Sequence, residues 1–144
     1  MNNWQNLVLV LFLVYSLAGF FYGLKYKKNP YGLCKRCTLI GAFVWTDAFI
    51  FGLFFSLISI LCLLLQQWVL FGLIYSVFWL VRSIGEQIYW FHEQFAVSHR
   101  NSPHTLLPSK LFKGEEVWIV MQTFWQCVSV VSVVASVYIV SFVL

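Results

Sequence analysis

Four long apolar segments, separated by short polar or turn-forming stretches, dominate the hydrophobic pattern of the chain. They cover about residues 4–24, 39–65, 69–95 and 117–144. As a helix rising about 1.5 Å per residue, the first segment would be about 31 Å long, which matches the thickness of a bilayer's hydrocarbon core. The pattern therefore predicts an all-α polytopic membrane protein, with one membrane domain built as a four-transmembrane-helix bundle.

The connections between the segments differ in length and charge. An uncharged turn at Gln66 joins the second and third segments, which predicts a tight antiparallel hairpin. Residues 25–38 and 96–116 form two polar loops, and the second of these contains prolines that break a helix. We therefore expect both polar loops to lie on one side of the membrane and the turn on the other.

Basic residues are concentrated in the two polar loops. Of nine Lys and Arg residues, five lie in residues 25–38 and three in residues 96–116, while Arg82 falls inside the third segment. The positive-inside rule then puts both loops in the cytoplasm and both termini outside. Because positive charge follows the first segment and does not precede it, we expect an N-out anchor and not a cleavable signal peptide. The predicted location is the plasma (inner) membrane, with anionic lipid at the basic face.

Composition supports the membrane assignment. Apolar residues make up 61% of the 144 residues and charged residues only 10%, too few to cover a soluble domain of this size. The net charge of +4 could indicate a nucleic-acid partner, but the basic residues flank apolar segments and do not line a solvated face. We therefore expect no nucleic-acid binding.

Three ionisable side chains fall deep inside the apolar segments, near mid-bilayer, where each needs a partner or a wet cavity. They are Asp47, Arg82 and Glu86, and counting along the helices puts them at similar depth. In one interpretation Arg82 bridges both acids in a structural network. In the other they form an ion, proton or head-group site, because one arginine cannot neutralise two ionised acids. The predicted polar site comprises Asp47, Arg82, Glu86, Gln122 and Gln126.

Small and polar residues recur at helical spacing and indicate the packed faces. Gly19 and Gly23 form a G-x-x-x-G pair, and Ser132 and Ser136 form a weaker small-residue pair, which suit either bundle packing or dimerisation. Two further stripes are expected to point inward. On the third segment the stripe is Gly72, Ser76, Trp79, Ser83, Glu86 and Glu93, and on the fourth it is Gln122, Gln126, Ser129 and Ser136.

Four cysteines carry the remaining candidate chemistry. Cys34 and Cys37 form a C-x-x-C motif before the second segment, whereas the other two lie inside apolar segments and are expected to pack. His99 and His104 lie in the other basic loop, which the topology puts on the same face. Two cysteines and two histidines at these spacings predict a tetrahedral zinc site.

A C-x-x-C motif after the first of four spans resembles the disulfide-generating quinone reductases of the DsbB type. That resemblance implies a thiol redox enzyme in which Cys34 and Cys37 react. The chain departs from the family in two respects. The loop between the third and fourth segments has no cysteine, and the predicted topology puts the motif in the reducing cytoplasm.

The sequence is compatible with three functions. The leading hypothesis is a non-enzymatic subunit or partner-binding element of a membrane assembly, either a homo-oligomer or a complex with other membrane subunits. The alternatives are a small ion or proton channel or carrier using the Asp47, Arg82 and Glu86 site, and a DsbB-like thiol redox enzyme. The chain contains no Gly-rich phosphate loop, nucleophile elbow or H-E-x-x-H motif.

Overall fold

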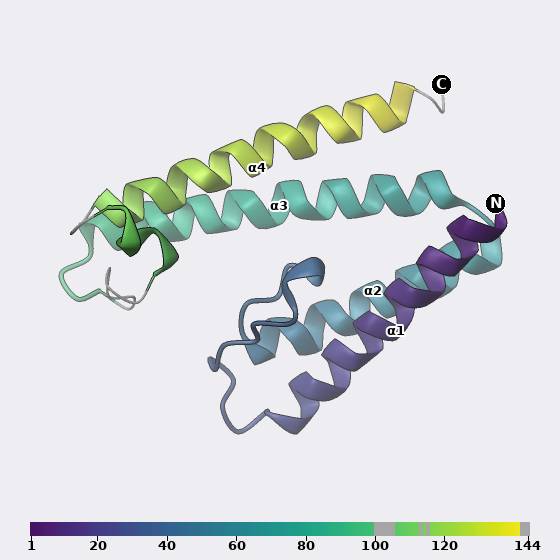
Figure 1. Cartoon of the computed structure of the whole chain (residues 1–144), viewed down its shortest axis with the longest axis horizontal. Coiled ribbons are helices and arrows are strands. Elements are labelled where there is room, and N and C mark those ends of the chain that lie inside the picture. Colours follow the sequence, from purple (N-terminus) through teal and green to yellow (C-terminus); the bar gives the residue numbers. More distant parts are fainter. Residues whose placement is uncertain (100–105, 113, 115, 142–144) are drawn as a thin grey trace. The chain divides into compact units, whose positions relative to one another are not determined.

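The computed structural model describes residues 1–99, 106–112, 114 and 116–141. As the hydrophobic pattern predicts, the described chain is all-α, with long helices α1 (Asn3–Lys25), α2 (Trp45–Leu65), α3 (Trp68–Phe95) and α4 (Glu116–Ser141) (Figure 1). These four helices are all long and apolar enough to cross a membrane. The chain divides into two compact units, Met1–Gly72 and Leu73–Leu144.

In the first unit, α1 and α2 approach each other closely at glycines. A Cβ atom placed on Gly52 would lie only 2.5 Å from the backbone nitrogen of Phe20, and one on Gly23 would lie 2.6 Å from the backbone nitrogen of Phe49. Real Cβ atoms do not come so near to backbone atoms, so only glycine permits this spacing. Small residues thus let the two helix backbones touch, as is usual for helices packed in a membrane.

Aromatic side chains of α1 also pack against α2 and against the first turn of α3. Phe12 meets Phe55 edge to face, with ring centroids 5.4 Å apart, and meets Phe71 in the same way at 5.1 Å. Phe20 stacks on Phe49 at 5.1 Å. Edge-to-face and stacked pairs are the favourable arrangements for aromatic rings.

A structured loop, residues 26–44, joins α1 to α2 and contains the short 3-10 helix η1 (Thr38–Ile40). Gly41 follows η1 in the left-handed conformation with φ 69°, and a single antiparallel bridge pairs Leu33 with Val44. The sequence predicted a span starting at residue 39, whereas α2 begins at Trp45. Residues 39–44 are apolar but belong to this folded loop, because the left-handed glycine and the bridge turn the chain before the helix starts.

In the second unit, side-chain hydrogen bonds connect α3 to α4 at several levels. The short 3-10 helix η3 (Leu107–Lys110) precedes α4. Serine and glutamine side chains then pair along the two long helices: Ser76 with Ser136 at 3.0 Å, Ser83 with Ser129 at 2.7 Å, and Gln94 with Gln122 at 2.6 Å. Such bonds hold helices together in lipid, where the hydrophobic effect does not drive association.

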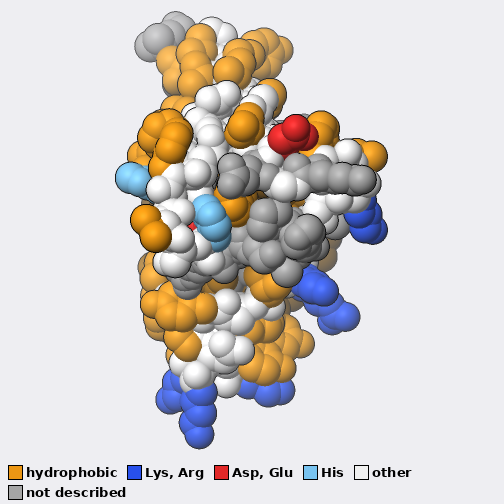
Figure 2. All heavy atoms as spheres, turned by 90° about the vertical axis from the view of Figure 1, so that its left-hand side faces the viewer, with side chains coloured by type: hydrophobic (Ala, Val, Ile, Leu, Met, Phe, Trp, Pro, Cys, Tyr) orange, Lys and Arg blue, Asp and Glu red, His pale blue; other side chains and the backbone are white. Residues whose placement is uncertain are grey.

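The surface of the protein is largely apolar. Large side chains on α1, α2 and α4 are well exposed, for example Phe21 at 61%, Leu64 at 77% and Val131 at 67%. Figure 2 shows hydrophobic side chains over much of the face in view, with few acidic ones. A surface of this kind is suited to lipid and not to water. The chain is therefore a small integral membrane protein.

Candidate functional site

A disulfide between Cys34 and Cys37 is the main chemical feature of the first unit. The loop holds it by backbone hydrogen bonds at each cysteine. The amide of Cys34 donates to the carbonyl oxygen of Phe43 at 2.9 Å, and the amide of Cys37 donates to that of Cys34 at 3.1 Å. Ala42 donates in turn to Cys37 at 3.1 Å. Both ends of the disulfide are thus fixed to backbone that the loop itself orders.

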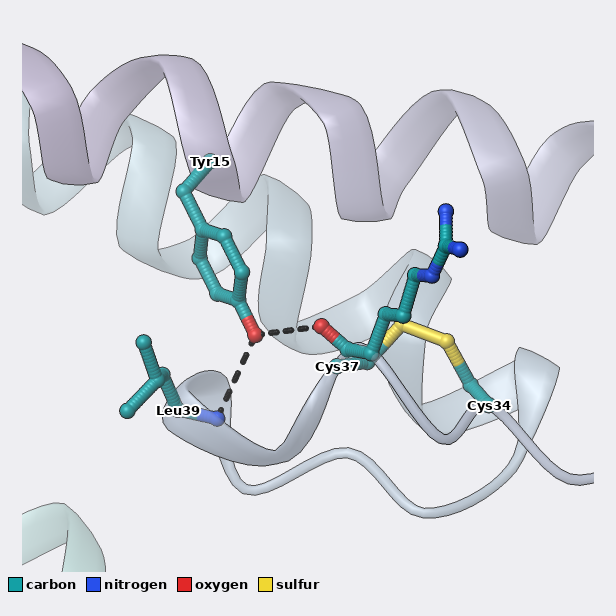
Figure 3. Close-up of a disulfide and its surroundings, with 5 residues drawn as sticks. Tyr15, Cys34, Cys37 and Leu39 are labelled. Atoms are coloured by element: carbon teal, nitrogen blue, oxygen red, sulfur yellow. Dashed lines mark hydrogen bonds between the residues drawn. A yellow bond between two sulfur atoms is a disulfide. The ribbon is translucent and has the colours of Figure 1, made fainter.

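Tyr15 of α1 fastens the same loop to the helix (Figure 3). Its hydroxyl donates to the carbonyl oxygen of Arg36, one of the two residues between the cysteines, at 2.6 Å. The hydroxyl oxygen of Tyr15 also accepts a hydrogen bond from the amide of Leu39 at 3.3 Å. One phenol therefore satisfies two backbone groups on either side of Cys37. The sequence analysis did not identify Tyr15, because nothing in its spacing distinguishes it from Tyr22, the other tyrosine of the first span.

A cavity of about 690 Å³ lies beside the disulfide, and both cysteines line it. Helix α1, the loop and Trp45 at the start of α2 supply the other walls, and the lining includes three cationic side chains but no Asp or Glu. Volumes of a few hundred to about 1,000 Å³ are typical of sites for small molecules. The residues that line it are Tyr15, Ala18, Gly19, Tyr22, Lys25, Tyr26, Leu33, Cys34, Lys35, Arg36, Cys37 and Trp45.

The disulfide itself is almost buried, with Cys34 2% and Cys37 4% exposed. It closes a loop of only a few residues, so the chain-entropy model assigns it a modest stabilisation of about 2 kcal/mol, compared with about 5 kcal/mol for a loop of about 100 residues. The loop is also held by its own backbone bonds and by Tyr15. The stability that this disulfide adds is therefore a weak reason for its presence, and its reactivity is the property to consider.

The predicted zinc ligands are distributed over both units. Cys34 and Cys37 lie in the first unit, and while their sulfurs are bonded to each other neither is the thiolate that zinc requires. His99 lies in the second unit, where its Nδ1 is 2.9 Å from the carbonyl oxygen of Glu93 and its ring packs 4.1 Å from that of Trp118. His104 falls outside the described residues. The zinc site of all four residues stays a prediction.

The predicted intramembrane ionic site also has members in both units. Asp47 lies in the first turn of α2, where the helix macrodipole stabilises a carboxylate. Arg82 and Glu86, one turn apart on α3, form an ion pair with 2.8 Å between Nη2 and Oε1, and both side chains are largely buried. Within that pair the formal charges cancel. A combined site with Asp47 stays a prediction.

The polar contacts between α3 and α4 include two glutamines that the sequence analysis missed. The side-chain nitrogen of Gln87 donates to Ser129 at 2.5 Å and to the carbonyl oxygen of Trp125 at 3.3 Å, and Gln94 donates to Gln122. The predicted stripe instead used Glu86 and Glu93, the residues immediately before them. Gln126 of the predicted site is exposed.

The signal for these contacts was a heptad. Gln122, Ser129 and Ser136 follow one another at intervals of seven residues on α4, and all three bond to α3. A repeat of 3.5 residues per turn marks the seam between two helices that wrap around each other. The predicted stripe on α3 already repeats at this period, with Gly72, Trp79, Glu86 and Glu93 seven residues apart, but it runs one position before Gln87 and Gln94.

The small residues predicted to pack lie at helix contacts. Gly19 and Gly23 are both buried, and a Cβ atom on Gly19 would lie 2.9 Å from the Cδ1 atom of Ile40. Ser136 bonds to Ser76 of α3, while Ser132 bonds to a carbonyl of its own helix. Ser132 also lines a shallow, almost wholly apolar groove of about 380 Å³ between α3 and α4.

Comparison with known proteins adds no family to these observations. No protein-family model matches the chain, and no curated protein or solved structure matches it. The candidate site is therefore interpreted from its own residues.

Proposed function

We propose that this protein is a membrane-embedded thiol–disulfide redox protein in which Cys34 and Cys37 alternate between a disulfide and two thiols. The observation that carries the proposal is the closed disulfide lining a cavity of about 690 Å³. A disulfide in so short a loop adds little stability, yet here it adjoins a cavity of the size that small molecules occupy. This arrangement suits reaction better than structural support.

The reaction balances as a simple exchange. A thiolate of the reductant attacks one cysteine sulfur, the disulfide bond breaks, and the other cysteine leaves as a thiolate that takes up a proton. A second thiol of the reductant then attacks the mixed disulfide and releases the first cysteine. Two electrons and two protons pass to the protein pair, and the reductant becomes a disulfide. The reverse sequence oxidises a dithiol.

The basic residues around the pair would assist this chemistry. Lys35 and Arg36 lie between the two cysteines, and Lys25 faces the same cavity. Positive charge near a cysteine favours the thiolate, which is both the attacking and the leaving form. With the basic loops in the cytoplasm, as the positive-inside rule predicts, a disulfide at this position would be transient and catalytic or sensing, as most cytosolic disulfides are.

The direct test is a redox titration of the pair in the whole protein. Cys62 and Cys127, the free cysteines, are replaced by alanine so that only Cys34 and Cys37 report. The protein is equilibrated in glutathione buffers, trapped with a mass-adding maleimide and separated by size. We expect reversible conversion of two sulfurs together, at a potential within the range of catalytic pairs. A pair that stays oxidised below about −300 mV would be structural and would contradict the proposal.

The side of the membrane is tested on the same variant. After reduction, a membrane-impermeant maleimide is applied to intact cells and to opened vesicles. Labelling of Cys34 and Cys37 only after opening supports a cytoplasmic pair and outer termini. Labelling of intact cells would place the loop outside, against the positive-inside prediction, and would bring the chain closer to the DsbB-type arrangement.

A second proposal, association with other membrane subunits or with further copies of the chain, is supported by the α3–α4 surface. The serines and glutamines of these helices form hydrogen bonds with one another, and the groove between α3 and α4 that Ser132 lines is almost wholly apolar. The test is the mass and composition of the particle extracted in mild detergent. The channel or carrier hypothesis is less well supported, because Arg82 and Glu86 neutralise each other.

A further inference from the structure

We propose that the redox partner of Cys34 and Cys37 is a small anionic thiol that binds in the cationic cavity beside them. This inference rests on the proposed redox function and adds the class of substrate. Three properties of the cavity support it: both cysteines line the cavity, cationic side chains line it too, and aromatic rings form part of its wall.

Access limits the size of the partner. Cys34 is only 2% and Cys37 only 4% exposed, and both residues line the cavity. An attacking sulfur must therefore enter the cavity to reach the disulfide. A volume of about 690 Å³ accommodates a molecule of metabolite or short-peptide size. A folded protein would have to insert a segment of its own chain.

The positive charge of the cavity favours a negatively charged partner. Lys25 from α1 and Lys35 and Arg36 from the loop line the cavity, and its lining contains no acidic residue. These side chains are exposed, so each interaction alone is screened by water. A cleft lined by one sign of charge nevertheless concentrates the field and the counter-charged ligand within it. The preferred partner therefore carries a carboxylate in addition to its thiolate.

Aromatic rings also line the cavity and give it an apolar surface. Tyr26 and Trp45 stack with ring centroids 4.4 Å apart, and the ammonium of Lys25 lies 5.7 Å from the centre of the Tyr26 ring. This wall would contact the carbon skeleton of the ligand while the cations hold its carboxylate. The reaction is the exchange given above: two thiols lose two electrons and two protons in all, and they leave as one small disulfide.

The experiment measures how fast three small thiols of different charge reduce the pair. Mercaptoacetate, mercaptoethanol and cysteamine are compared on the variant lacking Cys62 and Cys127, in discs of neutral lipid. Each rate is divided by the concentration of the thiolate form. It is then divided by the rate at which the same thiol reduces an uncharged soluble disulfide, which corrects for differences in intrinsic reactivity. We expect mercaptoacetate to react at least about tenfold faster than cysteamine at low salt, and this ratio to fall as salt is added.

Matched variants locate the effect. Lys25→Gln, and the triple variant with Lys35→Gln and Arg36→Gln, should bring the three normalised rates together. Lys27→Gln with Lys28→Gln removes charge from the same loop outside the cavity lining and should keep the preference. Lys25→Gln alone changes one exposed side chain, so it keeps the test valid where the triple variant does not fold.

Two results would overturn the inference, and they are distinguishable. Equal normalised rates for the three thiols, or an anionic preference that survives in the triple variant, would remove the anionic substrate while leaving the redox function in place. Failure of all three thiols to reduce the pair, in protein that remains folded, would remove the redox function as well.

Discussion

The hydroxyl of Tyr15 lies 2.6 Å from the carbonyl oxygen of Arg36 and donates a hydrogen bond to it across the space between α1 and the cysteine loop. The bond joins residues 21 positions apart in the sequence. Through Arg36, which is flanked by Lys35 and Cys37, it ties the position of the disulfide to the first membrane helix. The loop that contains the disulfide is thereby held to α1 by a side-chain hydrogen bond.

Tyr15→Phe should loosen the cysteine loop without changing its sequence. The variant loses the donor to Arg36 and the acceptor for Leu39, at a cost of about 1 kcal/mol for each hydrogen bond. We expect faster reduction of the disulfide by mercaptoethanol, because the sulfurs become easier to reach, together with a lower melting temperature. Tyr22→Phe, on the same helix and lining the same cavity, is the control and should change neither value.

Opening the disulfide should cost little stability. The chain-entropy model gives about 2 kcal/mol for so short a loop, and the hydrogen bonds of the loop remain. We therefore expect the Cys34→Ser and Cys37→Ser double variant to keep its helix content and to unfold only slightly earlier. Thermal melts followed by circular dichroism in the same detergent measure this. Loss of the folded state would show that the disulfide is structural and would weaken the redox proposal.

The length of the apolar runs was enough to predict the helices, but not where α2 starts. Residues 39–44 are apolar and extend the second run, so composition alone cannot separate them from the helix that follows. The left-handed Gly41 and the bridge between Leu33 and Val44 decide the matter, and both depend on contacts made only when the loop folds. A helix boundary inside an apolar run is therefore the least predictable feature of such a chain.

The candidate site was predictable only as a motif. C-x-x-C spacing allows a disulfide, a metal site or two free thiols, and the sequence analysis left both a zinc site with His99 and His104 and a thiol redox role open. The disulfide and its cavity depend on how α1 lies against the loop, a relation that no local pattern encodes. In the second unit, by contrast, the heptad of Gln122, Ser129 and Ser136 was visible in the sequence.

The serine pair of Ser76 and Ser136 should contribute measurable coupling between α3 and α4. Their hydroxyl oxygens are 3.0 Å apart, and hydrogen bonds between membrane helices average about 0.6 kcal/mol. A double-mutant cycle with both serines changed to alanine, followed by steric-trap or denaturant unfolding, measures this energy. The cycle of Ser76→Ala with Ser129→Ala is the control, because Ser129 bonds to Ser83 at another level. Equal coupling in both cycles would contradict a specific bond.

Gly52→Ala and Gly85→Ala should have opposite effects although the substitution is the same. A Cβ on Gly52 would lie 2.5 Å from the backbone nitrogen of Phe20 and 2.8 Å from the carbonyl oxygen of Ser16, so α1 and α2 must separate. Overpacking of this kind costs about 1–3 kcal/mol. A Cβ on Gly85 of α3 meets no atom within 4 Å, and alanine there gains up to about 1 kcal/mol of helix propensity.

Melts of the two variants against the parent protein measure the difference. A lower melting temperature for Gly52→Ala, with an unchanged or higher one for Gly85→Ala, supports the close contact of α1 and α2. Gly23→Ala should resemble Gly52→Ala, since its Cβ would lie 2.6 Å from the backbone of Phe49. Because α2 follows directly from the cysteine loop, separation of these helices should also change the rate at which the disulfide is reduced. Two destabilised glycine variants with an unaltered reduction rate would show that the cavity does not depend on this contact.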